Sequence, residues 1–200
     1  LSNHVLPIDR FTEKQGAGSF SASGTVDFNG MMDVDVTAND IALGLYTGLA
    51  GIDEPVSGTA SVTAHVGGTA HSPVADVSLS AKNGGVRGGT FDALAGEIQV
   101  RGSVVRVNQL TVHKYVDGVD YTAHVHGTLP LHALTADADE MLSAAEQIDL
   151  TLSLDHADLS LLPVFSREIE WALGRTEGEL TIRGSLAAPR VNGSLRIRDG

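Results

Sequence analysis

The sequence predicts an all-β protein, built as one long, curved, mainly antiparallel sheet with one or two short helices. Three observations predict this class. Apolar residues alternate with polar ones in many runs, as Leu180 and Ile182 alternate with Thr181, which is the period of a strand with one apolar face. Clusters of Gly, Pro, Asn and Asp separate these runs, as turns do between strands. A long segment also occurs twice.

The composition excludes several classes of partner and site. Hydrophobic residues make up 42% of the chain and aromatic ones only 4%, so the core is expected to be aliphatic. The formal net charge of −12 repels phosphate backbones and anionic head groups, so neither nucleic acid binding nor electrostatic docking to a membrane is expected. Without cysteine, a disulfide framework and a thiolate zinc site are excluded.

No targeting or membrane-spanning segment is recognisable in the sequence. No run approaches the roughly 18 apolar residues of a transmembrane helix, and no signal-peptide pattern is present. The chain begins at Leu1 without Met and ends at Gly200, directly after a strand-like run. We therefore expect it to be a piece of a longer protein whose membrane anchor, if present, lies outside it.

The internal repeat organises the chain. Pro73 in GGTAHSPVADVSLSAKNG matches Pro189 in RGSLAAPRVNGSLRIRDG, 116 positions later, and the same offset aligns the flanking residues without a gap. Residues 34–84 and 150–200 are therefore expected to be two copies of one unit, within a single segment covering residues 1–200.

Each copy predicts the same order of elements: a strand, an apolar stretch without alternation, a strand, a turn and a last strand. The turn has the pattern Gly-(Ser/Thr)-x-x-x-Pro, in which Gly permits a positive φ and Pro interrupts strand pairing. The last strand ends in Asn-Gly or Asp-Gly, which favours tight hairpins. Alternating runs before and between the copies continue the meander to roughly ten to twelve strands in total.

Two stretches are expected to be short helices that cover little of the sheet. Residues 137–147 begin with acidic side chains, and Asp137 and Glu140 have the spacing of a capping box. Residues 163–173 begin with Pro and are followed by Gly. Trp171 in the second stretch is interpreted as a helix anchor.

The aliphatic face of such a sheet is too long for two short helices to cover. A second sheet, a partner protein or an apolar ligand could cover it, and a strongly curved sheet would leave part of the face to a ligand. The residues expected to line this groove are Val34, Val36, Val62, Ala64, Val66, Val77, Leu79, Ile98, Val100, Val105, Val107, Leu110, Val112, Tyr121, Ala123, Val125, Leu150, Leu152, Leu154, Leu180, Ile182, Leu195 and Ile197.

The sequence predicts no catalytic residue, no metal site and no cofactor. It lacks the nucleophile-elbow, zinc-protease, phosphate-loop and dinucleotide motifs, and the glycine-rich residues 84–89 are expected to form a wide turn. His124 and His126 could bind a metal together with His113 or an acidic residue, but their alternation with apolar residues places them on the solvated face. Asp33 and Asp35 are likewise interpreted as a solvated pair.

A second acidic pair, Asp137 and Asp139, has a structural explanation. Both residues lie in the first turn of the helix expected at residues 137–147, where carboxylates stabilise the helix terminus. They are therefore not interpreted as the paired carboxylates of a glycosidase.

The repeated motif, in VTAHVGGTAHSPVADVSLSAKNG and GELTIRGSLAAPRVNGSLRIRDG, resembles the TamB branch of the AsmA-like family. The phrases IQVRGSVVRVNQLTVHKYVDG and YTAHVHGTLPL are similar to the segments between that family's repeats, so the resemblance covers residues 16–200. The sequence departs from the family's motif at Gly24-Thr25, which no Pro follows.

The resemblance implies a periplasmic protein of diderm bacteria, anchored in the inner membrane, whose β-rich body folds into a taco-like groove with an aliphatic interior. It further implies a role in outer-membrane biogenesis, in which the groove conducts phospholipids between the two membranes. A TamA-like outer-membrane barrel is the implied partner, reached through other parts of the full-length protein.

The residues support the same mechanism, because an apolar groove gains roughly 0.8 kcal/mol per acyl methylene that it buries. Smooth Val, Leu, Ile and Ala walls without polar anchors favour movement of a chain over capture at one place. Two other functions remain open at this point. The protein could be a chaperone or scaffold that binds unfolded outer-membrane proteins by strand addition, or a surface solenoid without a ligand.

Overall fold

The computed structural model describes residues 5–15, 18–27, 30–44, 56–86, 89–135, 145–158 and 175–198, with only the backbone described for residues 5–15. In these residues the chain forms one antiparallel sheet of eleven strands, and each strand pairs with its neighbours in the sequence. The prediction of an all-β protein with a long antiparallel sheet is confirmed. The sheet is open, and its edges are β1 and β11.

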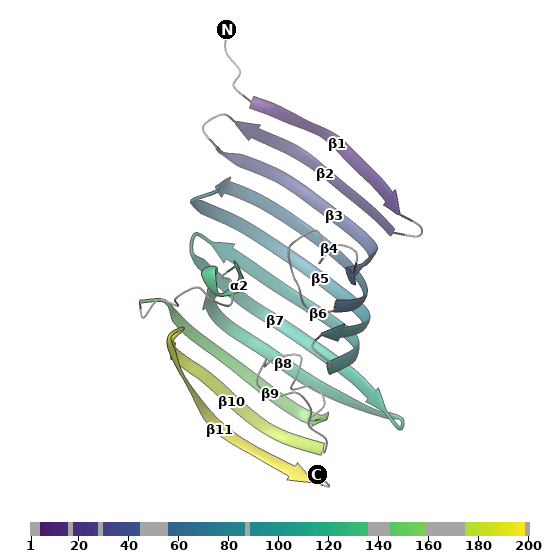
Figure 1. Ribbon diagram of the computed structural model, residues 1–200, viewed down its shortest axis with the longest axis vertical. Helices are drawn as coiled ribbons and strands as arrows, with labels where there is room; N and C mark the ends of the chain where they lie inside the picture. Colours follow the sequence, from purple (N-terminus) through teal and green to yellow (C-terminus); the bar gives the residue numbers. More distant parts are fainter. Residues whose placement is uncertain are drawn as a thin grey trace.

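Figure 1 shows the strands stacked along the long axis of the molecule and bent across it. In chain order they are β1 (Val5–Gln15), β2 (Gly18–Asp27), β3 (Met32–Ala42), β4 (Val56–Thr69), β5 (Ser72–Val86), β6 (Gly89–Arg101), β7 (Val104–Val116), β8 (Val119–Pro130), β9 (Gln147–Asp158), β10 (Arg175–Ser185) and β11 (Ala188–Arg198). The short helix α2 (His132–Thr135) follows β8.

The strand register keeps apolar residues on one face of the sheet. Val36 pairs with Ala64, Ala64 with Val77, Val77 with Ile98, and Ile98 with Val107. Residues that pair directly across antiparallel strands point to the same side, so these side chains share one face, which we call the inner face. The opposite side, which carries Asp35 and its neighbours in register, is the outer face.

The buried core lies on the inner face where the middle strands meet. Val112 and Ala123, which pair across β7 and β8, have no exposed surface, and they belong to a cluster that includes Leu154 and Ala157 from β9. Phe91 supplies the aromatic ring of this cluster. Aliphatic side chains therefore build most of this core, as the composition predicts.

Two glycines permit the close approach of neighbouring strands. Gly127 in β8 has a φ of +134°, and a Cβ at this position would lie 2.1 Å from the carbonyl oxygen of Asp149 in β9. Gly84 in β5 leaves room for the ring of Phe91, because a Cβ there would lie 1.9 Å from the ring carbon Cζ. The absence of a side chain at these points lets the strands bend and pack tightly.

Bulges correct the register without moving the apolar residues off the inner face. The pairing of β3 with β4 shifts between Ala38 and Ile41, where Asp40 has a φ of +47°. The pairing of β9 with β10 shifts in the same way beside His156, whose φ is +46°. Because an extra residue would otherwise turn the following side chains outward, each bulge preserves one apolar face.

Where both copies of the repeated segment are described, they share several local features. The positive-φ residues Asp40 and His156 lie 116 positions apart, as do the turn prolines. In the first copy Gly68 pairs with Pro73, and in the second Gly184 pairs with Pro189. Strands β3–β5 and β9–β11 are thus equivalent three-strand units in the same sheet.

Several expectations about turns and helices have different outcomes. The wide turn expected at residues 84–89 is wrong, because β5 continues to Val86, which pairs directly with Gly89. Pairing extends through this region because glycines do not prevent an extended backbone. The helix expected at residues 137–147 lies mostly outside the described residues, although its last residue begins β9, and the one at 163–173 lies wholly outside them.

Polar side chains interact across the strands on the outer face. His65 Nδ1 in β4 lies 2.9 Å from Asp35 Oδ1 in β3, and Asp33 Oδ1 lies 3.8 Å from the other ring nitrogen. Arg101 donates two hydrogen bonds to the carboxylate of Asp76, at 2.7 and 3.0 Å. The hydrogen bond to Asp35, together with the charges of nearby aspartates, raises the pKa of His65 above its ordinary value of 6.5.

The substitution Gly127→Ala is expected to destabilise the protein. Its Cβ would meet the Asp149 carbonyl oxygen, and a residue other than glycine is strained at this φ, which costs about 1–3 kcal/mol. For a chain of this length the thermal midpoint should fall by roughly 3–10 °C, as measured by circular dichroism. Gly67→Ala is the control, because its Cβ would make only an ordinary contact of 3.5 Å. Equal midpoints for the two variants would contradict this role for Gly127.

The substitution Asp35→Asn is expected to lower the pKa of His65 toward 6.5, because a neutral amide replaces the charged acceptor of the hydrogen bond from the imidazole. A raised histidine pKa stabilises the folded state fully below pH 6.5, and this contribution is lost as the pH rises through the folded-state value. Titration of the His65 ring protons by NMR measures the shift. Asp33→Asn should lower it less, and an unchanged pKa in Asp35→Asn would refute the assignment.

Candidate functional site

The inner face of the sheet is the candidate functional site. Cross-strand pairing joins its apolar residues into four ladders that run along the long axis of the sheet. One of them, which we call the central ladder, consists of Phe20, Ala38, Val62, Leu79, Gly96, Leu110, Val125, Leu152, Leu180 and Gly193. It therefore crosses every strand from β2 to β11.

The other three ladders lie on both sides of the central one. The first contains Val34, Val66, Ala75, Val100, Val105 and Leu129, and the second contains Val36, Ala64, Val77, Ile98, Val107, Gly127, Leu150, Ile182 and Val191. The third contains Ile41, Ala60, Ala81, Leu94, Val112, Ala123, Leu154, Gly178 and Leu195. Tyr121 and Ile197 extend the apolar face at its margin.

The register thus brings all the residues expected to line the groove onto a single face. Their exposure separates them into two groups. The buried ones are Ala64, Val105, Val107, Val112, Tyr121, Ala123, Leu152 and Leu154. The others remain at least partly exposed: Val34, Val36, Val62, Val66, Val77, Leu79, Ile98, Val100, Leu110, Val125, Leu150, Leu180, Ile182, Leu195 and Ile197. The buried side chains pack beneath the inner face, and the side chains of the second group form its accessible surface.

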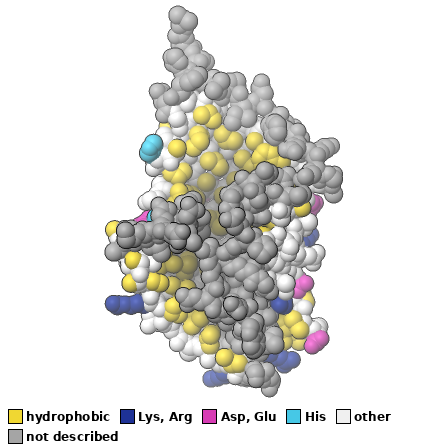
Figure 2. Space-filling view, in the orientation of Figure 1, with side chains coloured by type: hydrophobic (Ala, Val, Ile, Leu, Met, Phe, Trp, Pro, Cys, Tyr) yellow, Lys and Arg dark blue, Asp and Glu magenta, His cyan; other side chains and the backbone are white. Residues whose placement is uncertain are grey.

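The accessible part of the inner face is continuous along most of the central ladder. Val62, Leu79, Leu110 and Val125 are all partly exposed, and after the buried Leu152 the ladder reaches the partly exposed Leu180. Figure 2 looks onto this face and shows hydrophobic side chains gathered on it, with charged side chains at the margins. The surface is therefore an extended apolar strip.

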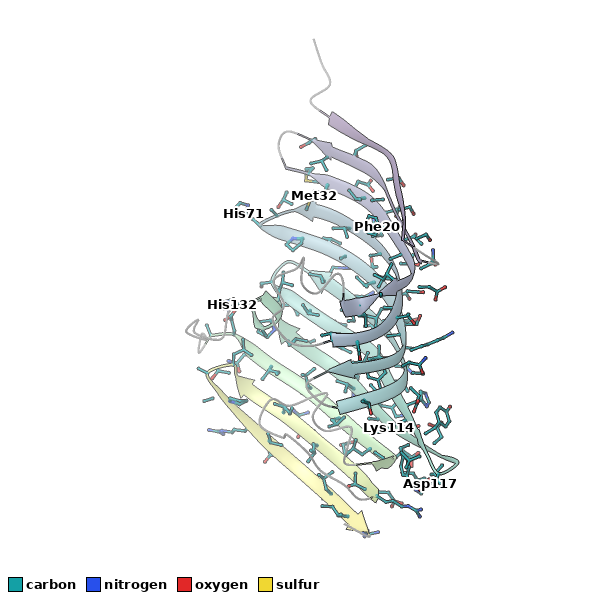
Figure 3. All side chains as sticks on the ribbon, turned by 45° about the vertical axis from the view of Figure 1, so that its right-hand side comes forward. Phe20, Met32, His71, Lys114, Asp117 and His132 are labelled. Atoms are coloured by element: carbon teal, nitrogen blue, oxygen red, sulfur yellow. The ribbon has the colours of Figure 1, made fainter. Side chains whose placement is uncertain are left out.

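The four ladders contain no ionisable side chain. Charged residues lie on the outer face or at the ends of the strands, as Lys114 and Asp117 do at the tip of the β7–β8 hairpin in Figure 3. A surface of this kind offers dispersion contacts and excludes water, but it gives a ligand no fixed polar partner. Nothing in the four ladders would select the position of an apolar ligand.

In the described residues no group of three or more His, Asp or Glu side chains is arranged to hold a metal ion. Two of the histidines considered above, His113 and His124, have other partners. His113 Nδ1 lies 3.1 Å from both carboxylate oxygens of Asp120, and His124 Nδ1 lies 3.1 Å from Thr111 Oγ1. Asp137 and Asp139 lie outside the described part of the chain.

Sequence reasoning did not identify the polar features at the ends and on the outside of the sheet. A depression of about 440 Å³ on the outer face is lined by Asp35, His65 and residues of β5 and β6, among others. A second cavity, of about 270 Å³, lies where β8 separates from β9 and β10. The concentration of arginines in β10 and β11 was the one available signal for the second cavity.

Comparison with known proteins agrees with this architecture. The family model of the TamB C-terminal domain matches residues 9–200. No curated protein and no solved structure matches the chain. Among the described residues, no helix has the length and hydrophobicity that a membrane crossing requires.

The TamB family is a transport and assembly module of the cell envelope, associated with the periplasm, and it is not an enzyme family. Membership is consistent with a role in outer-membrane biogenesis. The match covers nearly the whole chain, including the repeated Gly-(Ser/Thr)-x-x-x-Pro turns and the eleven-stranded sheet that they help to build. The chain therefore belongs to the TamB family, through the domain described as the TamB C-terminal domain.

Proposed function

We propose that the inner face binds the acyl chains of phospholipids and forms one segment of a hydrophobic path between the inner and outer membranes. One observation carries this proposal: cross-strand ladders without ionisable residues run continuously across the sheet, and many of their side chains remain partly exposed. An apolar surface of this extent is unfavourable in water unless something covers it.

The energetics suit long hydrocarbon chains. Each methylene removed from water contributes about 0.8 kcal/mol, so a chain lying along the central ladder gains affinity from many weak contacts. Because the ladder has no polar anchor, a shift by one strand exchanges equivalent contacts. We expect the chain to move along the ladder with small barriers, while its head group stays in water at the margin.

The proposed setting is the periplasm of a diderm bacterium. In this proposal the membrane anchor lies in other parts of the parent protein, and the inner face is continued by neighbouring segments beyond this chain. A TamA-like outer-membrane barrel would be engaged through those other parts. The described sheet supports such continuation, because β1 and β11 each pair with a strand on one side only.

A second candidate function follows from the edge strand β11. Its apolar residues Val191 and Ile197 are 62% and 53% exposed, and its outer backbone edge has no paired strand in the described part of the chain. An extended polypeptide could add to this edge, with main-chain hydrogen bonds and apolar contacts. This would make the domain a chaperone or scaffold for unfolded outer-membrane proteins.

The substitution Leu180→Arg is expected to reduce the phospholipid that co-purifies with the protein by roughly tenfold or more. A guanidinium held among acyl chains loses its hydration without gaining a partner, which costs several kcal/mol, and each 1.4 kcal/mol is tenfold in binding. Native mass spectrometry measures the bound lipid. Thr181→Arg is the matched control, because Thr181 is the next residue in β10 and belongs to the outer face. Equal lipid loss in both variants would count against the inner face.

A photo-crosslinking amino acid at Leu79 or Val125 is expected to label phospholipid, because both positions lie on the accessible central ladder. The same group at Ser78, on the outer face, should label little lipid. Predominant crosslinking to polypeptide from the inner positions, and from Val191, would overturn the lipid path and favour the chaperone. The products are identified by mass spectrometry.

A further inference from the structure

Strand β11 is an edge of the sheet, and its two faces differ in chemistry. Figure 1 shows it at the C-terminal end of the stack of strands. The strand register places Val191, Leu195 and Ile197 on the inner face and Arg190 and Arg196 on the outer face. The outer backbone edge of β11 has no paired strand in the described part of the chain. A strand that paired with this edge would therefore meet apolar side chains on one face and arginines on the other.

The internal repeat shows how an equivalent edge is covered elsewhere in the same sheet. Each residue of β11 has a counterpart 116 positions earlier in β5, and β5 pairs along its length with β6. Val191 and Ile197 are 62% and 53% exposed, whereas their counterparts Ala75 and Ala81 are 8% and 7% exposed. Strand β11 thus leaves open the apolar positions that a neighbouring strand covers in the first copy.

Arg190 and Arg196 are exposed and have no ion-pair partner among the described residues. Glu177, which is opposite Arg196 in the register, lies 3.1 Å from His156 Nδ1. Arg190 is opposite another arginine, Arg183. The outer face of this edge therefore carries uncompensated positive charge, although the chain as a whole has a net charge of −12.

The covered edge in the first copy has opposite charges on its outer face. Arg101 of β6 donates two hydrogen bonds to the carboxylate of Asp76 in β5, at 2.7 and 3.0 Å. On β11 the charged residues are arginines, so a strand that docks in the same way needs carboxylates on its outer face. A second copy of this chain cannot supply them through its own β11, because that strand contains three arginines and no acidic residue.

We infer that the free edge of β11 is a docking site for an extended segment of another polypeptide, whose side chains alternate between apolar and acidic. The segment pairs antiparallel with β11, as β6 pairs with β5. Its apolar side chains then continue the inner face, and its carboxylates meet Arg190 and Arg196. This site rests on the second candidate function, strand addition at β11, to which it adds the charge of the partner. The lipid path does not depend on it.

The probes are two synthetic peptides built on the sequence of β6, GTFDALAGEIQVR. In the pairing of β6 with β5, Ala95 and Arg101 are opposite the counterparts of Arg196 and Arg190. The acidic peptide carries Ala95→Glu and Arg101→Glu, and the basic peptide carries Ala95→Lys and Arg101→Lys. Both are titrated at low ionic strength into the 200-residue chain, and binding is followed by NMR at the backbone amides of residues 188–198.

The acidic peptide is expected to bind about tenfold more tightly than the basic one, because opposite-charge pairs across the strands replace like-charge pairs. The net charge of −12 favours the basic peptide, so a preference for the acidic peptide has to come from the arginines of β11. Amides of β11 should also gain protection from hydrogen exchange, because strand addition pairs the free backbone edge.

The variant Arg190→Gln/Arg196→Gln should lose the preference for the acidic peptide. The matched control is Lys82→Gln/Arg106→Gln, which makes the same change of net charge at exposed positions of β5 and β7 and should keep the preference. The single variant Arg196→Gln should lose part of it, and it provides the measurement if the double variant does not fold.

Three results would overturn the docking site in different ways. Equal affinity of the two peptides for the wild-type chain, or a preference that survives in Arg190→Gln/Arg196→Gln, would remove the charge requirement and leave strand addition in place. Failure of both peptides to shift the β11 amides at millimolar concentration would also overturn strand addition at this edge, whereas the lipid path is tested separately by Leu180→Arg. A chain that is dimeric by analytical ultracentrifugation, with its β11 amides already protected, would show that a second copy occupies the edge.

Discussion

Cross-strand register on one face is the constraint on which the rest of this structure depends. Side chains alternate along a strand, so a slip of one residue in any of the ten pairings would send all following apolar residues to the wrong side. The bulges at Asp40 and His156 show how the chain accommodates extra residues without such a slip. The core around Val112 and Ala123, the accessible central ladder and the polar outer face all follow from this register.

The alternation of apolar and polar residues predicted which side chains point to the inner face better than it predicted how deeply each one is buried. Val105 and Leu110 lie five positions apart, so strict alternation would put them on opposite faces. The bulge in β7 returns both to the inner face. Their apolar side chains predicted this placement without knowledge of the bulge. Burial depends on the curvature of the sheet and on contacts between distant ladders. Sequence patterns could not show that Leu152 is buried while Leu180, its partner in register, stays partly exposed.

The sequence predicted one kind of turn correctly and another wrongly, and it did not predict the polar contacts between strands. The Gly-(Ser/Thr)-x-x-x-Pro motif specifies local geometry, and both of its copies form equivalent hairpins. Glycine permits many conformations, but Gly84 and Gly85 are extended within β5, where the ring of Phe91 packs over Gly84. The contacts of His65 with Asp35, and of Arg175 with Tyr121, join residues on different strands. Only the arrangement of the strands in the folded sheet brings such residues together, so no local pattern could reveal them.

The strictly sequential pairing of the strands has a consequence for how such a domain changes its length. Because each strand pairs only with its neighbours in the chain, stability is close to a sum of adjacent interfaces, as in repeat proteins. Insertion of a complete hairpin would lengthen the molecule and keep every existing pair, whereas insertion of a single strand would reverse the chain direction for all strands that follow. A protein of this design can therefore be extended during evolution in steps of two strands.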